Sequence, residues 1–240
     1  MYNYLDMVLY FSIYAFLGWC LETTYASKRA KKFINRGFLT GFFCPIYGFG
    51  AVIIILSSQW VSNVCDNQFV SLIVSIVLSV ILVTVLEYIT GYILDKTFNY
   101  KWWDYSKETA NLHGYICVKY SVLWGLLALL LVNTVHTVVS EIILPIQILT
   151  KSYIVNFLMF YFLIDIIKSV IDALDLREVI QNYSNFSLIK YHEKIIEHKR
   201  FFLAFPHLRI LNEDIKHGNV MSILNDRMVR IKIKLKSRFL

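Results

Sequence analysis

Acidic side chains inside long apolar runs are the residues of this chain best placed to carry chemistry. Glu22 and Glu87 each lie about one turn from the end of an apolar segment, and Arg36 lies just before the next such segment. A charge at membrane depth is costly unless it is paired or solvated, so it usually faces a bundle interior. We expect the two acids to share one depth and to bracket a basic group or polar substrate, with Arg36 as counter-ion. The alternative is that both acids only hold neighbouring helices together.

A glycine-rich stretch directly follows Arg36 and contains a single proline, Pro45. Proline removes a backbone donor and disfavours a straight helix, and glycine allows a backbone or a ligand to come close. One interpretation is a broken or re-entrant helix that lines a cavity. The other is a kinked, tightly packed helix. The candidate residues for a substrate site or polar cavity are Glu22, Arg36, Gly41, Pro45, Tyr47, Gly48, Glu87 and Asp104.

Other polar residues favour structural roles. Asp165, Lys168 and Asp172 are spaced three and four apart, so they share one helix face and predict a self-neutralising Asp–Lys pair. His113 has no second ligand near it in the sequence, and the four cysteines have no metal or disulfide spacing. The sequence contains neither an intramembrane Ser/His pair nor an HExxH motif. We therefore predict no catalytic set, no metal and no cofactor.

The apolar runs around these residues are long enough to cross a membrane. A spanning helix needs about 20 mostly apolar residues, and the segments that qualify are 4–25, 38–61, 69–94, 115–139 and 148–174. Hydrophobic residues make up 57% of the chain and charged residues 17%, against roughly 45–50% and about 25% in soluble domains. The sequence predicts an all-α, polytopic membrane bundle of about five transmembrane helices with a helical cytoplasmic tail. It excludes a simple cytosolic enzyme, a disordered chain and a secreted disulfide scaffold.

Lysine and arginine alternate between the loops, which predicts the orientation in the membrane. The loop after the second span has neither residue, and the loop after the fourth has only Lys151 near its end. This pattern places the N-terminus outside and the C-terminus in the cytoplasm of a cell (plasma) membrane. The basic loops, after the first and third spans, contain Lys28, Arg29, Lys31, Lys32 and Arg36, and Lys96, Lys101 and Lys107.

Residues 1–174 are predicted to form the transmembrane domain and residues 175–240 a basic, amphipathic cytoplasmic tail. From Leu174 onward the chain has 13 Lys/Arg against 7 Asp/Glu. Apolar spacing predicts a helix that Pro206 ends and a second helix after Asn219, although alternation over 229–236 also fits a strand. The tail is expected to contact anionic lipid and not nucleic acid; docking onto a cytosolic partner is the alternative. The expected surface contacts are Lys232, Lys234, Lys236 and Arg238.

Several short motifs occur in an order that resembles a known family. They are FLGWCLE (16–22), RGFLTG (36–41), CPIYGFG (44–50), LEY (86–88), WWDYS (102–106), NLHGYIC (111–117) and SVLWG (121–125). In this order they are similar to the bacterial Putative ABC-transporter type IV family, or CmpB-like membrane proteins, over about residues 9–131. The resemblance implies a permease-like subunit of an ABC-type transporter. The chain has no GxxxxGK[ST] phosphate loop, so such a subunit would need a separate ATPase and a second copy of itself.

Three functions compete on the sequence alone. The first is the permease-like transport subunit, with unknown substrate. The second is a non-catalytic regulator or assembly factor that binds a partner through its cytoplasmic tail. The third is an intramembrane enzyme that processes lipid or peptide, in which paired carboxylates would act as acid and base.

Overall fold

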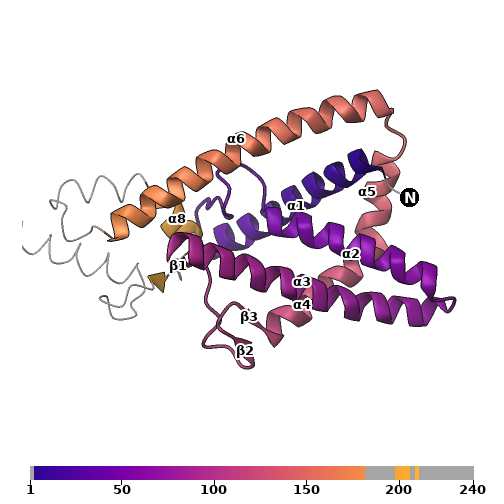
Figure 1. Cartoon of the computed structure of the whole chain (residues 1–240), viewed down its shortest axis with the longest axis horizontal. Coiled ribbons are helices and arrows are strands. Elements are labelled where there is room, and N and C mark those ends of the chain that lie inside the picture. Colours follow the sequence, from indigo (N-terminus) through magenta and orange to yellow (C-terminus); the bar gives the residue numbers. More distant parts are fainter. Residues whose placement is uncertain (1–2, 182–197, 206–208, 211–240) are drawn as a thin grey trace, which may run out of the picture. The chain divides into compact units, whose positions relative to one another are not determined.

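The computed structural model of the chain describes residues 3–181, 198–205 and 209–210 (Figure 1). The long helices are α1 (Tyr4–Ala30), α2 (Pro45–Val64), α3 (Gln68–Phe98) and α6 (Ile148–Gln181). Between α3 and α6 lie α4 (Val118–Leu130), the π-helical turn η1 (Leu131–Val135) and α5 (His136–Ile143). The remaining elements are short: α8 (Lys199–Ala204), β1 (Tyr100–Lys101), β2 (Asn111–Leu112), β3 (Ile116–Cys117) and β4 (Arg209–Ile210).

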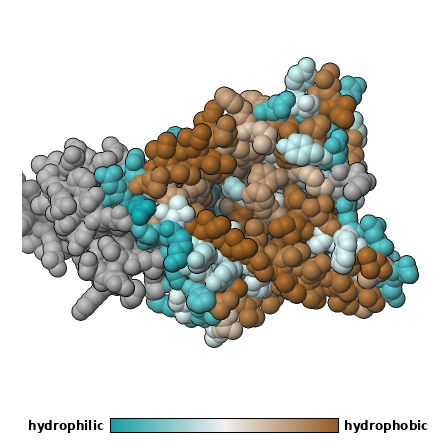
Figure 2. Space-filling model, in the orientation of Figure 1, coloured by the Kyte–Doolittle hydropathy of each residue, from teal (hydrophilic) through white to brown (hydrophobic). Residues whose placement is uncertain are grey.

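Five helical segments of the described chain are long and apolar enough to cross a membrane, which confirms the predicted fold class. They are α1, α2, α3, the continuous α4–η1–α5 segment, and α6 through Glu178. Large apolar side chains such as Val77, Leu126 and Phe157 are exposed on these helices. Figure 2 shows hydrophobic side chains over much of the visible face. A soluble protein would rarely expose so much apolar surface, whereas a bilayer would cover it.

The start of the second span differs from the prediction. Residues 38–44 are not helical, and α2 begins at Pro45 instead of residue 38. Proline is favoured at the first helical position, where its missing N–H costs no hydrogen bond. Of the two interpretations of this stretch, the kinked helix is therefore wrong, because Pro45 begins the helix and does not interrupt it. The fourth span begins at Val118 instead of residue 115, and α6 continues to Gln181, beyond the predicted residue 174.

The described residues divide into two compact units. The first contains the described residues of Met1–Thr90 and Tyr105–Ile171, and the second contains Gly91–Asp104 and the described residues of Asp172–Leu240. In the first unit α1 and α2 lie side by side (Figure 1). Its main apolar cluster contains Leu9, Tyr10, Tyr14, Ala51, Ile55, Val139, Ile143 and Val155, from α1, α2, α5 and α6. The predicted division into residues 1–174 and 175–240 stays a prediction.

Small residues bring α2 and α3 together. Ser71, Ser75 and Ser79 recur every fourth residue on α3 and are buried, and Ser57 of α2 lies 3.4 Å from Ser79 between hydroxyl oxygens. Small residues at this spacing let membrane helices approach closely. Glu87 lies two such steps beyond Ser79, on the same buried face of α3.

The fourth span contains a π-helical turn that the sequence analysis did not predict. η1 interrupts the α-helical pattern, and His136 follows it directly. The His136 Nδ1 atom and the Tyr14 hydroxyl of α1 share a hydrogen bond of 2.9 Å. The extra residue of a π-turn rotates the helix that follows it, and here the rotated segment brings a polar ring against α1.

The second unit is small and rich in aromatic contacts. Trp102 is buried and its ring lies 4.7 Å from that of Phe205, between centroids. The Tyr100 hydroxyl donates to the carbonyl of Ala173 at 2.9 Å, and β1 pairs with β4 in antiparallel fashion. α8 ends before Pro206, as predicted, whereas residues 182–197 and the predicted second helix or strand after Asn219 lie outside the described residues.

Candidate functional site

The chain between α1 and α2 turns back along α1 without forming a helix. The Ser27 hydroxyl accepts from the backbone N–H of Ile34, and the Thr23 hydroxyl accepts from that of Arg36. At the far end the N–H of Cys44 donates to the carbonyl of Ala15 at 2.9 Å. Residue 15 lies about 22 Å along the axis from the C-terminus of α1, at 1.5 Å per residue. The segment 33–44, which we call the re-entrant segment, therefore runs deep into the bundle.

Asp165 of α6 holds the middle of the re-entrant segment. Its carboxylate accepts the backbone N–H groups of Thr40, at 3.0 Å, and Gly41, at 3.1 Å. The Ser169 hydroxyl accepts a second contact from Thr40 N–H at 2.8 Å. Non-helical backbone is tolerated at membrane depth only where its polar groups find protein partners. Asp165 supplies such a partner. Lys168 is exposed and takes part in none of the ion pairs of the described residues, so the predicted Asp–Lys pair within Asp165, Lys168 and Asp172 is wrong.

Glycines permit the close packing around this segment. A Cβ atom at Gly41 would overlap the hydroxyl oxygen of Tyr161 and lie 2.6 Å from Asp165 Oδ2. At Gly48 it would lie 2.7 Å from the ring and from the carbonyl oxygen of Phe11. Both glycines were predicted as site residues, and both stand where the backbone comes close to another helix.

Glu22 and Arg36 form an ion pair at the base of the re-entrant segment. Arg36 Nε lies 3.1 Å from Glu22 Oε2, and both side chains are about one-third exposed. The Tyr47 hydroxyl of α2 donates to Glu22 Oε1 at 2.7 Å. Tyr47 reaches this position across Gly18 of α1, where any Cβ atom would overlap the tyrosine side chain. The predicted counter-ion of Glu22 is therefore the observed one, and Gly18 is a residue that the sequence analysis missed.

Glu87 lies in the same polar region but has different partners. It is 5% exposed, and its oxygens accept from Trp124 Nε1 of α4 at 3.1 Å and from the Tyr105 hydroxyl at 3.3 Å. The Trp124 ring also packs against Tyr47, with 5.2 Å between centroids. Tyr47 and Trp124 thus connect the Glu22 carboxylate to the Glu87 carboxyl. We call Glu22, Arg36, Tyr47, Glu87, Tyr105 and Trp124 the polar cluster.

The loop from Tyr105 to Cys117 covers one side of Glu87. The Tyr105 N–H donates to the carbonyl of Gly114 at 2.8 Å, and the short strands β2 and β3 pair in antiparallel fashion. The Tyr105 ring stacks on Tyr120 with 4.4 Å between centroids. Burial, and next the nearby Glu87 carboxyl, raise the pKa of Tyr105 well above its usual value. Its hydroxyl therefore stays protonated at neutral pH and remains a donor.

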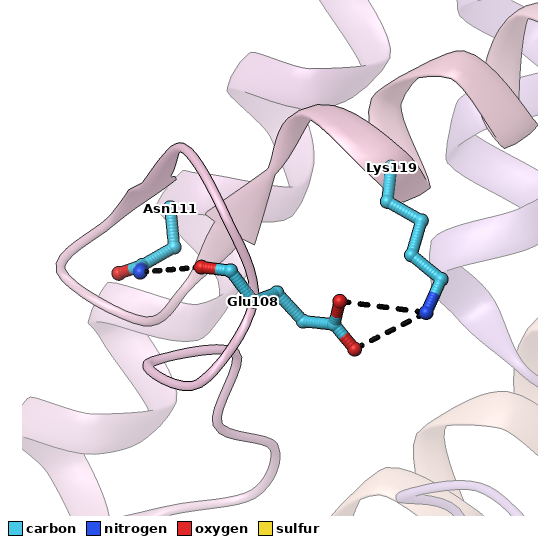
Figure 3. Close-up of polar contacts among 3 residues, drawn as sticks. All are labelled: Glu108, Asn111 and Lys119. Atoms are coloured by element: carbon cyan, nitrogen blue, oxygen red, sulfur yellow. Dashed lines mark hydrogen bonds and ion pairs between the residues drawn. The ribbon is translucent and has the colours of Figure 1, made fainter.

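An exposed ion pair fastens this loop to the start of α4. Figure 3 shows both carboxylate oxygens of Glu108 directed at the Lys119 ammonium, at 3.2 and 3.4 Å. The Asn111 side-chain amide donates to the carbonyl of Glu108 at 2.9 Å. His113 adopts a positive φ of 52° and shares a 3.1 Å hydrogen bond with the Tyr88 hydroxyl. These contacts hold the loop in one conformation over Glu87.

The structure brings four of the predicted residues into the cluster: Glu22, Arg36, Tyr47 and Glu87. Gly41 and Gly48 pack nearby chain segments, and Pro45 begins α2. Asp104 belongs to the second unit. Tyr105 and Trp124 were missed as site residues, although both lie in motifs that the sequence analysis noted. Among the described residues no group of three metal-ligating side chains occurs.

A separate, apolar groove of about 560 Å³ lies between α2 and α3. Leu56, Ser57 and Trp60 line it from α2, and Leu82, Leu86 and Ile89 are among the residues from α3. None of the predicted cavity residues lines this groove. The polar cluster is therefore distinct from the groove.

A buried ion pair lies at the opposite end of α1 from Glu22. Lys151 Nζ of α6 is 2.6 Å from Asp6 Oδ1, and both side chains are less than one-tenth exposed. Asp6 also accepts the backbone N–H of Asn3 at 3.1 Å, which completes a capping box at the start of α1. The sequence analysis noted Lys151 only as a loop residue and did not predict this pair.

Comparison with known proteins gives one family match. The family model described as Putative ABC-transporter type IV matches residues 9–170, which include every residue of the polar cluster. No curated protein and no solved structure matches the chain.

Proposed function

The chain belongs to the Putative ABC-transporter type IV family, and from this premise we propose that it is a permease-like, membrane-embedded subunit of an ABC-type transporter. The observation that carries the proposal is the re-entrant segment, which lies deep in the bundle beside the polar cluster. Broken backbone next to intramembrane charges is typical of substrate sites in transporters. The substrate is unassigned.

The polar cluster supports this function by its chemistry. Glu22 and Arg36 have opposite charges, and their side chains are about one-third exposed. A charged solute could therefore displace one partner of the pair and bind the other. Tyr47 and Trp124 add a hydroxyl group and an aromatic face beside them. Such a site would select by hydrogen bonds and charge and would accept solutes that an apolar groove rejects.

The wider assembly follows from the same proposal. The protein sits in the cell membrane with the N-terminus outside and the C-terminus in the cytoplasm. A separate ATPase binds on the cytoplasmic side, and a second copy of the chain completes the pathway. In this orientation Arg36 and the polar cluster lie toward the cytoplasmic face, where the ATPase would act.

Purification of the intact protein from native membranes tests the proposal. We expect an ATPase with a phosphate-binding loop to co-purify, and the complex to hydrolyse ATP. Arg36→Gln should lower this hydrolysis because it breaks the Glu22 pair, whereas Lys119→Gln, which alters the exposed Glu108 pair, should not. Recovery of a sensor or a wall-synthesis enzyme without any ATPase would favour the regulator instead.

A further inference from the structure

The four carboxyl groups that are buried or half-buried in the spans of the first unit are held in different ways. Asp6 pairs with Lys151 and Glu22 pairs with Arg36. Asp165 accepts two backbone N–H groups and the Ser169 hydroxyl. Opposite charges and several backbone donors both favour the charged form of a carboxyl group. Each of these three groups therefore has compensation for a negative charge.

Glu87 has no such compensation. Its side chain is as buried as that of Asp6, yet its hydrogen-bond donors are one indole and one phenol, both uncharged. It takes part in none of the ion pairs of the described residues. The other charged or titratable groups of the cluster are Glu22, Arg36, Tyr47 and Tyr105, with Tyr120 stacked on Tyr105. Arg36, the one cation among them, is engaged by Glu22.

The two groups that donate hydrogen bonds to Glu87 differ in chemistry. This difference indicates which of the two carboxyl oxygens can carry a proton. The indole N–H of Trp124 can only donate, so Oε2 must accept whether or not Glu87 is charged. The Tyr105 hydroxyl can donate or accept. A proton on Oε1 would reverse the direction of the Tyr105 bond and leave the Trp124 bond unchanged.

We propose that Glu87 is a proton-binding site of the membrane bundle, which takes its proton on Oε1 from the side of the Tyr105–Cys117 loop. The proton needs no cavity, in keeping with the packed surroundings of the side chain. Tyr105 links the site to the loop through its N–H bond to Gly114. A change in the charge of Glu87 would therefore first alter the hydrogen bonds of this loop. The inference does not depend on the transport function.

Infrared difference spectroscopy on the full-length protein in lipid vesicles tests the proposal. Lowering the pH, but keeping it above about 5.5 so that ordinary exposed carboxyl groups stay charged, should produce a band from the C=O stretch of a protonated carboxylic acid. Glu87→Gln should remove this band, and Glu22→Gln, a matched change in the same cluster, should keep it. Tyr105→Phe should keep the band at a shifted frequency, because the Oε1–H group loses its acceptor. A band that survives in Glu87→Gln, or one that disappears in Glu22→Gln, would overturn the assignment.

Chemical labelling of the unmutated protein tests the same proposal without the Glu87→Gln variant, in case that variant does not fold. An apolar carbodiimide reaches carboxyl groups from the bilayer and adds as a whole molecule to the protonated form, so the peptide gains the full reagent mass. Mass spectrometry should locate the label on Glu87, in decreasing amounts as the pH rises, and not on Asp6 or Asp165. Labelling of Asp6 or Asp165 in preference to Glu87, or equal labelling of all three, would contradict the proposal.

Discussion

At the scale of single residues, the first unit contains three ion pairs of very different exposure among its described residues. Asp6 and Lys151 are almost fully buried, Glu22 and Arg36 are about one-third exposed, and Lys119 is largely exposed. Burial decides how much the loss of one partner costs, because the remaining charge must then stay away from water. The three pairs should therefore respond differently to mutation.

We predict that Lys151→Met destabilises the protein far more than a surface substitution. Removing one partner of a buried pair costs about 3–5 kcal/mol, whereas replacing both by apolar residues is often neutral. Asp6→Leu combined with Lys151→Met should recover most of the loss. Unfolding in detergent, followed by circular dichroism, measures these differences.

Lys119→Met is the control, and we expect it to leave stability nearly unchanged because the Glu108 pair is exposed to water. Equal stabilities of the wild type and Lys151→Met would show that the Asp6 pair contributes little.

Sequence reasoning found four of the six residues of the polar cluster but only some of the contacts between them. Arg36 could be paired with Glu22 because one lies near the end of the first span and the other just before the second. The ion pair confirms that expectation. The partners of Glu87 were not predicted, because Trp124 lies 37 residues further on and meets it only through the packing of α3 against α4. Aromatic residues in apolar runs give no signal that their N–H or O–H groups face a carboxyl group.

At the scale of elements, the re-entrant segment depends on α6. Asp165 accepts the N–H groups of Thr40 and Gly41, which have no helix to satisfy them. We predict that Asp165→Leu loosens this segment and exposes the buried thiol of Cys44. Maleimide labelling with peptide mass spectrometry should then show faster modification of Cys44, by about tenfold if about 1.4 kcal/mol of local stability is lost.

Lys168→Leu is the matched control on the same helix, since that side chain is exposed. It should leave the labelling of Cys44 at the wild-type rate. A slow rate in Asp165→Leu would mean that the contacts of the segment with α1 suffice to hold it.

The spans themselves were predictable, but their irregular parts were not. Hydropathy identifies apolar length, and all five spans follow from it. Residues 38–43 include Phe38, Leu39, Phe42 and Phe43, so their composition alone does not distinguish a packed loop from a helix. The available sequence signals of a non-helical segment were the glycine at 37 and the proline at 45. In the structure Gly37 has a φ of 130°, and Pro45 is the first residue of α2. The π-turn at Leu131–Val135 leaves no comparable mark in the sequence.

At the scale of the whole molecule, the alternation of basic loops predicts the orientation. A reporter that is active only in the cytoplasm should work when fused after Leu240 and fail when inserted near Asn67, between α2 and α3. The physical reason is that basic short loops stay on the cytoplasmic side. Activity at Asn67 would reverse the topology.

The basic tail gives a second prediction at this scale. Neutralising Lys232, Lys234, Lys236 and Arg238 in a peptide of residues 219–240 should weaken its binding to anionic vesicles by about 1 kcal/mol per residue. Added salt should have the same effect, because it screens the attraction. Equal binding of the unchanged peptide to neutral vesicles would argue against an electrostatic role.

The bonds from Asp165 to Thr40 and Gly41 also order events during biosynthesis. The two partners are separated by more than 120 residues, so the segment emerges from the ribosome long before the carboxylate that satisfies its backbone. Until α6 has entered the bilayer, those N–H groups must remain hydrated or bound to another protein. The re-entrant segment therefore reaches its final place only after the last span is made, although it is among the first parts of the chain to be translated.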